Sequence, residues 1–347
     1  MLKLPPLDAL LPWYEANKRD LPWRHTKDPY RIWVSEIMLQ QTRVEAVLPY
    51  YRRFLDTLPT VADLAAAPET LLLKLWEGLG YYSRVRNMQK AARSIMENEN
   101  GVFPTTYEGI RALCGVGDYT AGAVASFAFD LPYPAVDGNV LRVAARLLAH
   151  EGNVLSPATK KELTAAVAAA QKALPPATFN QAIMELGATV CLPNGAPRCD
   201  ACPLADRCLA KKRNKTDAIP VRLKPTKRKI QPKTVLVLRQ NDTVLLHRRA
   251  PNGLLAGLFE PICLEGHQEM EEIQQLLLSW GFSPRSITPL GEAKHIFTHL
   301  EWHMTGYEIL LDGDETPPPN DCVFARRTDL DTLFAIPSAF RAYRPFM

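Results

Sequence analysis

The sequence has no apolar run long enough to span a membrane, and its first residues, MLKLPP, lack the apolar core of a signal peptide. It also lacks internal repeats and low-complexity segments. Positive and negative residues are nearly balanced, because the 347 residues carry a net charge of only +4. With 47% hydrophobic and 22% charged residues, the chain has the composition of an ordinary globular protein. We expect a cytoplasmic monomer without a membrane partner, and composition alone favours an anionic partner only weakly.

The chain is long enough for two domains, and its patterns change twice along its length. Residues 1–210 show helical periodicity almost throughout and predict an all-α domain. Residues 211–233 combine Lys and Arg with three prolines and predict a basic interdomain linker. Residues 234–347 show shorter periods and predict a smaller α+β domain.

Individual elements follow from the same patterns. Helices are expected, with Gly or Pro punctuation between them, over residues 30–54, 63–79, 81–97, 107–113, 120–129, 140–148, 157–174 and 179–190. In the C-terminal part a helix is expected over residues 269–280, and strands are expected over residues 234–239, 244–248, 259–264, 303–311 and 323–327.

Four of the seven cysteines form a cluster with the spacing Cys-x7-Cys-x2-Cys-x5-Cys. They are Cys191, Cys199, Cys202 and Cys208. In a reducing compartment such a cluster indicates metal ligation rather than disulfides. Four thiolates can hold a [4Fe–4S] cluster or a structural zinc ion, and the spacing alone does not choose between them.

Two features that could serve chemistry share the stretch from Leu113 to Val140. Gly115 and Gly117 stand one residue apart between two predicted helices, which is typical of a helix-hairpin-helix whose backbone N–H groups can bind an anion. Asp137 follows in a Val-Asp-Gly-Asn turn immediately before another helix. A phosphate anchor and a carboxylate are therefore expected close together in the sequence.

A second carboxylate, Glu36, lies within the predicted helix of residues 30–54 and is surrounded by large apolar residues. Such a glutamate is either on the polar surface of the helix or a desolvated acid with a raised pKa. The residue pattern leaves both interpretations open.

Taken together, these motifs resemble the helix-hairpin-helix DNA glycosylase superfamily, and within it the MutY family of adenine DNA glycosylases. The resemblance rests on the hairpin, the Val-Asp-Gly-Asn-Val segment, the four cysteines, and the segments LPWR at 21–24, SEIMLQQT at 35–42 and GLGYYSR at 78–84. It implies base excision repair in bacterial cytoplasm, at the nucleoid, on double-stranded DNA with 8-oxoguanine:A or G:A mispairs. It also implies a [4Fe–4S] cluster on the four cysteines.

The resemblance assigns roles to the two carboxylates. Glu36 would protonate the adenine, Asp137 would stabilise the oxocarbenium ion, and Asn139 and Tyr119 would lie beside them. A related branch of the superfamily has a lysine at position 119, whose amine forms a Schiff base with the sugar. Since tyrosine cannot do so, we expect base excision without strand cleavage.

Further contacts are implied by the same comparison. The adenine pocket would consist of Trp23, Arg24, Leu39, Gln181 and Met184. The DNA strand and 8-oxoguanine would be contacted by Gln41, Thr42, Tyr81, Gly115, Gly117, Phe297, Thr298 and His299.

The C-terminal domain resembles a MutT-type (Nudix) fold, but residues 266–281 lack the acidic helix that binds magnesium for pyrophosphate hydrolysis. The resemblance therefore implies 8-oxoguanine recognition without hydrolase chemistry.

Three departures from the family pattern are present. The first cysteine gap has seven residues instead of six, Cys114 replaces a proline, and Thr298 replaces a serine.

Two alternatives to a monofunctional adenine glycosylase remain at the level of sequence. One is a bifunctional glycosylase/lyase for oxidised pyrimidines, and the other is a non-catalytic iron–sulfur DNA-binding protein that serves as a redox sensor. The linker is a candidate surface for contacts with other repair proteins.

Overall fold

The computed structural model describes residues 2–193, 196–223, 228–312 and 317–347. The chain forms two compact units. The first contains residues up to 66 and residues 87–223, and the second contains residues 67–86 together with the C-terminal part from residue 228 onward. Within the described ranges, no helix combines the length and the apolar character that crossing a membrane requires.

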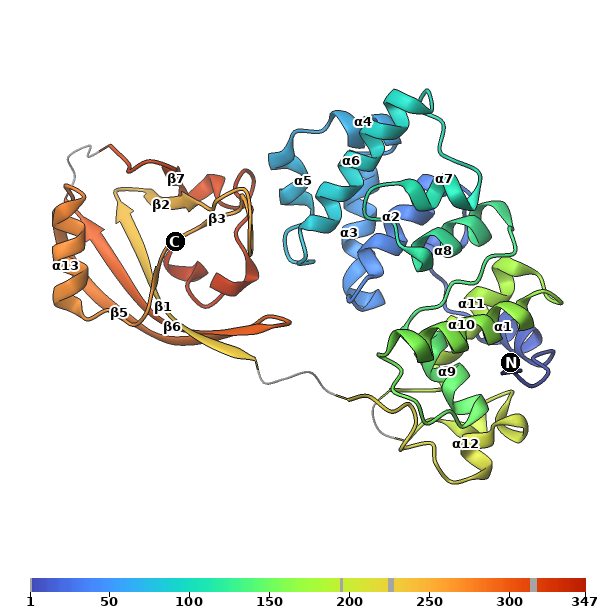
Figure 1. Cartoon of the computed structure of the whole chain (residues 1–347). Coiled ribbons are helices and arrows are strands. Elements are labelled where there is room, and N and C mark those ends of the chain that lie inside the picture. The colour runs from blue at the N-terminus through green and yellow to red at the C-terminus, as the bar shows by residue number, and fades with distance from the viewer. Residues whose placement is uncertain (1, 194–195, 224–227, 313–316) are drawn as a thin grey trace. The chain divides into compact units, whose positions relative to one another are not determined.

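The first unit is helical (Figure 1). Its elements are α1 (Leu10–Asn17), η1 (Pro22–Arg24), α2 (Pro29–Leu39), α3 (Val44–Thr57), α4 (Val61–Ala66), α7 (Tyr107–Ala112), α8 (Asp118–Phe129), α9 (Gly138–Leu148), α10 (Pro157–Gln171), α11 (Pro176–Thr189), η2 (Cys199–Ala201), η3 (Ala205–Arg207) and α12 (Leu209–Lys212). Helix α5 (Glu69–Leu75) belongs to the second unit, and α6 (Ser83–Asn98) begins there and continues into the first.

The helix predicted over residues 30–54 is wrong, because the structure has two helices there. Helix α2 ends at Leu39 and α3 begins at Val44. Between them Gln41 has a φ of +59°, which a right-handed helix does not allow. The prediction over residues 63–79 fails similarly: α4 ends before Pro68, whose ring disfavours helical backbone in the residue that precedes it.

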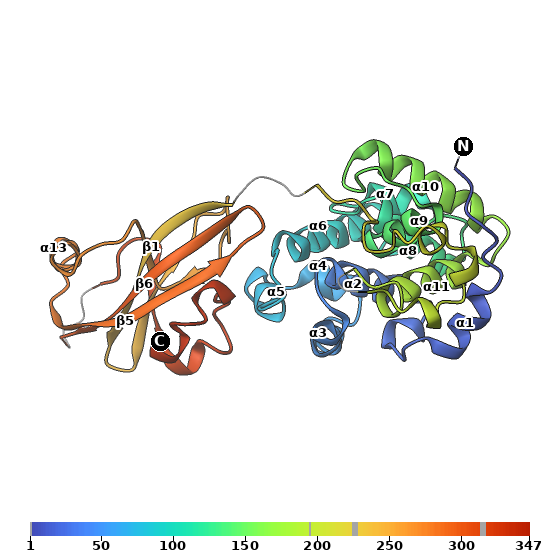
Figure 2. The ribbon, with the colours of Figure 1, turned by 90° about the horizontal axis from the view of Figure 1, so that it is seen from below.

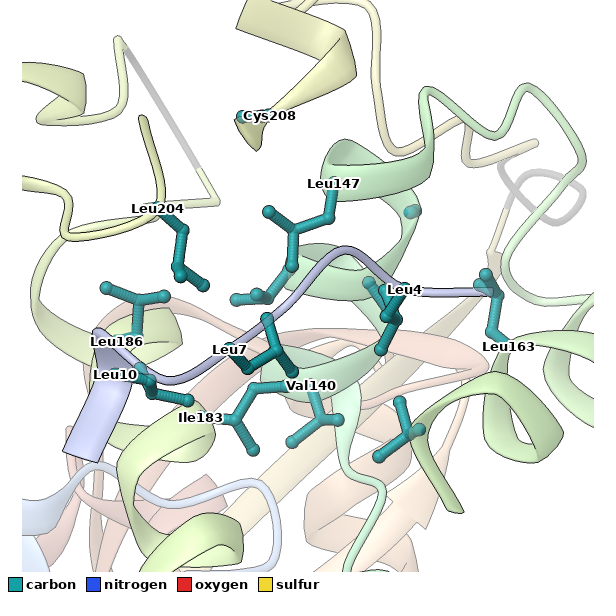
Figure 3. Close-up of a cluster of buried hydrophobic side chains, with 14 of the residues drawn as sticks. Leu4, Leu7, Leu10, Val140, Leu147, Leu163, Ile183, Leu186, Leu204 and Cys208 are labelled. Carbon is teal, nitrogen blue, oxygen red and sulfur yellow. The ribbon is translucent and has the colours of Figure 1, made fainter. Parts of the chain in front are cut away.

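One buried apolar cluster holds together the elements around α9 (Figure 3). The N-terminal segment contributes Leu4, Leu7 and Leu10, and these pack against residues of α9 and α11 such as Val140 and Ile183. The segment that carries the cysteines joins the same cluster through buried Leu204 and Cys208. The cysteine segment and the beginning of α9 therefore share one core.

The second unit contains a seven-stranded mixed sheet with the order β3-β2-β1-β6-β5, to which β4 adds by pairing with β1 and β7 by pairing with β2. Strands β1 and β6 are parallel and all other pairs are antiparallel. The strands are β1 (Lys229–Gln240), β2 (Thr243–Arg248), β3 (Phe259–Glu260), β4 (Ile262–Glu265), β5 (Pro284–Ile296), β6 (Leu300–Leu311) and β7 (Cys322–Arg326).

Alternation along β1 explains how the sheet buries both faces. Val235 and Val237 belong to one buried cluster, which contains the C-terminal residues Phe340 and Tyr343. Leu236 and the neighbouring alternate residues belong to a second cluster, to which α13 (Met270–Ser279) contributes. Figures 1 and 2 show α13 and the C-terminal turns on opposite sides of the sheet.

The predicted helix of this unit is present, and so are the strands predicted over residues 234–239, 244–248, 303–311 and 323–327. The single strand predicted over residues 259–264 is wrong, because β3 ends at Glu260, β4 begins at Ile262 after Pro261, and the two pair with different strands. Strand β5 was missed. Its residues alternate weakly between half-buried and exposed, and two register irregularities interrupt its pairing with β6. A strand with such a pattern gives little periodic signal in the sequence.

The close contact of α8 with the segment that leads to α9 depends on Gly122. A Cβ atom at this position would lie 2.3 Å from the carbonyl oxygen of Pro134, which is backbone and cannot turn aside. We expect Gly122→Ala to lower the free energy of unfolding by about 1–3 kcal/mol, as overpacking does in other cores.

Thermal unfolding of the full chain, followed by circular dichroism, would test this. The matched control is Gly138→Ala, because a Cβ there meets no atom within 4 Å. Equal melting temperatures for the two variants would contradict the expected clash.

Candidate active site

A cavity of about 160 Å³ opens in the helical unit between the ends of several helices. Its walls come from η1, α2, α8, the beginning of α9, and α11. The structure brings together in this cavity the predicted residues Trp23, Arg24, Glu36, Leu39, Thr42, Tyr119, Asp137, Asn139, Gln181 and Met184.

Glu36 is a buried acid, with 3% of its surface exposed, so the structure selects the desolvated interpretation. Burial is the main cause that raises the pKa of Glu36 to about 7, and the negative charge of Asp137 contributes to the same shift. Two groups oppose this shift: the Tyr119 hydroxyl, which donates a hydrogen bond of 2.5 Å to Glu36 Oε2, and the nearby Arg24. A carboxyl group with this pKa can donate a proton near neutral pH.

Asp137 is the N-cap residue of α9. Its Oδ1 accepts a hydrogen bond of 2.8 Å from the backbone N–H of Val140, and its Oδ2 accepts one of 2.7 Å from Asn139 Nδ2. Burial raises the pKa of Asp137, and these hydrogen bonds oppose the shift. Because donors surround Asp137, whereas Glu36 accepts from Tyr119, the arrangement favours the proton on Glu36 and the charge on Asp137.

Tyr119 and Asn139 link the carboxylates to the rest of the unit. Burial and the nearby carboxylates keep the pKa of Tyr119 well above 10, so its hydroxyl remains a donor. Asn139 Oδ1 accepts a hydrogen bond from Arg142 Nη2 at 2.8 Å. Arg142 also donates to the carbonyl oxygen of Cys191 at 2.7 Å, which connects the cysteine segment to the residue beside Asp137.

Sequence reasoning missed two charged residues that line the cavity, Arg19 and Glu185. Glu185 accepts hydrogen bonds from both Arg19 and Arg24. The sequence did contain a signal for Glu185, because this residue lies in an apolar helical run, as Glu36 does. Glu185 also follows Gln181 by four residues, so Gln181 and Glu185 share one face of α11. Tyr14 was also missed, and its hydroxyl donates to Gln181 Oε1 at 2.5 Å.

The predicted hairpin connects α7 to α8. Gly115 has a φ of +77°, and a Cβ atom there would lie 2.7 Å from Asn87 Cβ. Gly117 is the N-cap residue of α8 and is exposed, so the first amides of this helix are accessible at the surface. Cys114 is exposed beside them, and nothing in the structure explains its presence.

The remaining predicted DNA contacts lie outside the cavity. Gln41 occupies the bend between α2 and α3. In the second unit, Tyr81 is 47% exposed and its hydroxyl forms a hydrogen bond with that of Thr298. Thr298 and His299 form the turn between β5 and β6, while Phe297 packs edge-on against Trp302 at 4.9 Å.

All four clustered cysteines line one small cavity of about 30 Å³ in the first unit. Arg146 Nη1 lies 3.2 Å from Cys191 Sγ and donates to the carbonyl oxygen of Leu192. Among the described residues, no three His, Cys, Asp or Glu side chains converge closely enough to hold a single metal ion. Part of the seven-residue gap, residues 194–195, lies outside the described residues.

The predicted linker is described only in part, because residues 224–227 lie outside the described residues. Strand β1 begins at Lys229, within the range assigned to the linker.

Both domains of the chain are similar to families of known proteins. A family model described as "HhH-GPD superfamily base excision DNA repair protein" matches residues 34–169, and a NUDIX domain model matches residues 234–344. A solved thermostable thymine-DNA glycosylase is 27% identical with a TM-score of 0.53, and the match covers 60% of this chain and 95% of that one. The helical unit therefore has the fold of a base excision DNA glycosylase.

Two curated relatives show which kind of DNA glycosylase this chain resembles. The chain is 37% identical to an adenine DNA glycosylase of Rattus norvegicus, over 89% of this chain and 70% of the relative. It is 34% identical to an adenine DNA glycosylase of Buchnera aphidicola, over 88% of this chain and 86% of the relative. The chain belongs to the adenine DNA glycosylase family.

The raised pKa of Glu36 has a measurable consequence without any DNA. Because this pKa lies at about 7 in the folded protein, against 4.5 for an ordinary glutamate, the folded state holds the proton more tightly than the unfolded chain does. Stability linked to this group is therefore present below about pH 4.5 and is lost as the pH rises through 7. Glu36→Gln removes the titration, so the variant should gain up to about 3 kcal/mol over the wild type above pH 7.

Chemical denaturation of both proteins across this pH range would measure the difference. Glu45→Gln is the control, because the Glu45 side chain is 76% exposed and its replacement should give no pH-dependent gain. A Glu36→Gln gain that is the same at every pH would contradict the raised pKa.

Proposed function

We propose that this DNA glycosylase excises adenine paired with 8-oxoguanine, and also with guanine, and that it leaves the DNA strand intact. One observation carries the proposal: Glu36 and Asp137 line the same cavity, and their surroundings favour a proton on the first and a charge on the second. Breaking the bond between adenine and deoxyribose requires both an acid and an anion.

The reaction follows from these two states. The adenine leaves the helix and enters the cavity between Trp23, Leu39 and Met184, with Arg24 and Gln181 at its polar edge. Glu36 transfers its proton to N7, so the electron pair of the glycosidic bond passes to a neutral leaving base. Asp137 stabilises the positive charge that develops at C1′, or bonds to it, until water adds and leaves an abasic site. Asn139 and Tyr119 hold the two carboxyl groups in place.

The lining of the cavity argues against a lyase step. Schiff-base formation needs an amine, and among the described residues that line the cavity there is no lysine. Position 119 presents a phenol hydrogen-bonded to Glu36. A monofunctional enzyme is therefore favoured over the bifunctional alternative.

DNA contacts extend this proposal beyond the cavity. The amides that follow Gly115 and Gly117 would bind a phosphate, which gives affinity independent of sequence. Gln41, Thr42 and the exposed ring of Tyr81 would contact the region opposite the extruded base. The turn with Phe297, Thr298 and His299 would contact 8-oxoguanine, and the basic linker would meet other repair proteins.

The four cysteines would hold a [4Fe–4S] cluster. Their side chains fit this group because they line one cavity, and the guanidinium of Arg146 beside Cys191 Sγ would balance thiolate charge. When bound, the cluster would cross-link the segment that carries the four cysteines. The cysteine segment itself supports the site through Arg142, which contacts both Cys191 and Asn139.

The identity of this group can be tested on the purified protein. An iron–sulfur cluster gives a broad visible absorption band, whereas zinc is colourless. We expect a brown protein with about four iron atoms per chain, and Cys202→Ser should lose the colour. A colourless protein that contains stoichiometric zinc would contradict this assignment.

The excision itself is tested with Asp137→Asn. With protein in excess over an 8-oxoguanine:A duplex, the wild type should create alkali-labile sites on the adenine strand, and a G:A duplex should react as well. Asp137→Asn should bind the 8-oxoguanine:A duplex but lose excision by about a thousandfold or more, because asparagine still caps α9 but carries no charge.

A matched control is Asp28→Asn, since Asp28 is the N-cap residue of α2 and asparagine also caps there. It should excise at the wild-type rate. Wild-type protein that binds the duplex without any excision would instead favour the non-catalytic DNA-binding alternative, and a covalent adduct trapped by borohydride would favour the bifunctional lyase.

A further inference from the structure

A third carboxylate lies in the wall of the same cavity, and the proposed reaction does not use it. The Glu185 side chain, on α11, is fully buried. Its Oε1 accepts hydrogen bonds from Arg19 Nε at 2.8 Å and from the Arg19 backbone N–H at 3.1 Å. Its Oε2 accepts from Arg19 Nη2 at 3.0 Å and from Arg24 Nη2 at 2.6 Å. Burial alone would raise the pKa of Glu185, but these two arginines lower it to about 2.

Arg24 is held at both ends of its guanidinium. One terminal nitrogen binds Glu185, and the other donates to the carbonyl oxygen of Arg19 at 2.9 Å. The group lies over the ring of Tyr14, with Cζ 5.5 Å from the ring centre, and only 12% of the Arg24 side chain is exposed. Its position therefore depends on Glu185 as its anionic partner.

Glu36 faces titratable groups from three other elements. Tyr119 comes from α8, Asp137 from the start of α9, and Arg24 from η1. Of these three, Arg24 is the cation. Without Glu185, the carboxyl groups that remain in the described cavity wall with Arg24 would be Glu36 and Asp137.

We propose that Glu185 is a positioning residue that binds Arg24 and so prevents this guanidinium from pairing with Glu36. The inference rests on the proposed function, in which Glu36 gives its proton to the base. A guanidinium paired with Glu36 would favour the carboxylate, which has no proton to give. Glu185 would thus maintain the acid without touching the adenine.

The test is the pH dependence of excision by Glu185→Gln, measured in single turnovers with protein in excess over an 8-oxoguanine:A duplex. In the wild type the rate should fall as the pH rises and Glu36 loses its proton. In Glu185→Gln the midpoint of this fall should move to lower pH by about one to two units, the effect of a newly paired opposite charge. The rate loss should be largest above neutral pH and should recover toward acid pH.

Three variants separate this role from a structural one. Glu185→Asp should restore much of the wild-type midpoint, and Arg24→Gln/Glu185→Gln should restore it whatever the maximal rate, because the displaced cation is gone. Glu45→Gln removes an exposed carboxylate 3.9 Å from Arg19 and should leave the midpoint unchanged.

The outcomes are distinct. A folded Glu185→Gln protein whose rate falls equally at every pH would overturn the inference and assign Glu185 to structure alone. If that variant does not fold, Arg24→Gln provides the test. Removing this cation should leave the midpoint of the pH profile unchanged or raise it, because Arg24 favours the ionised form of Glu36. A midpoint below that of the wild type would contradict the inference. An inactive wild type would refute the proposed function itself, which is a different result.

Discussion

Two buried carboxyl groups in one cavity impose the constraint on which the rest of the site depends. Like charges in one site oppose the ionisation of both groups, so the loss of both protons is disfavoured, and the neighbouring donors decide which group keeps its proton. Asp137 receives a backbone N–H and a side-chain amide, whereas Glu36 is buried and receives the Tyr119 hydroxyl. The difference between the two positions is a difference in hydrogen-bond donors, and it comes from placing Asp137 at a helix N-terminus and Glu36 within a buried helix.

The hydrogen-bond donors to the two carboxyl groups come from the beginnings of α8 and α9. Their positions therefore depend on how closely these helices pack against their neighbours. At Gly187 of α11 a Cβ atom would lie 2.6 Å from Asn139 Cβ, and glycine alone permits this approach to the start of α9. Arg142 then joins Asn139 to the carbonyl oxygens of Gly187 and Cys191. The cysteine segment is therefore part of the support of Asp137, although it lies outside the cavity. If the cysteine segment lost its ordered structure, Arg142 would lose its contact with Cys191, and Asn139 beside Asp137 would be held less firmly.

Much of this arrangement was predictable from the sequence, and the failures have physical causes. The Asp28 and Asp137 turns carry local signals, because a capping residue acts within three positions of itself. The break at Gln41 has no such signal, since neither glycine nor proline marks it, and strand β5 lacks clear alternation. Whether Glu36 is buried depends on what packs against α2, which is tertiary information. The same holds for Glu185, whose partners are about 160 residues away in the sequence.

The charges that line the cavity give a physical reason for the role proposed for Glu185. The described wall contains three carboxyl groups, Glu36, Asp137 and Glu185, and two guanidinium groups, Arg19 and Arg24. With Glu36 protonated, two negative and two positive charges balance, and ionising Glu36 leaves one negative charge in excess. A buried site opposes such an excess because little water is present to solvate it. The proton on Glu36 is therefore expected to depend on the whole set of charges, and a change that removes one anion from the wall should make that proton easier to lose.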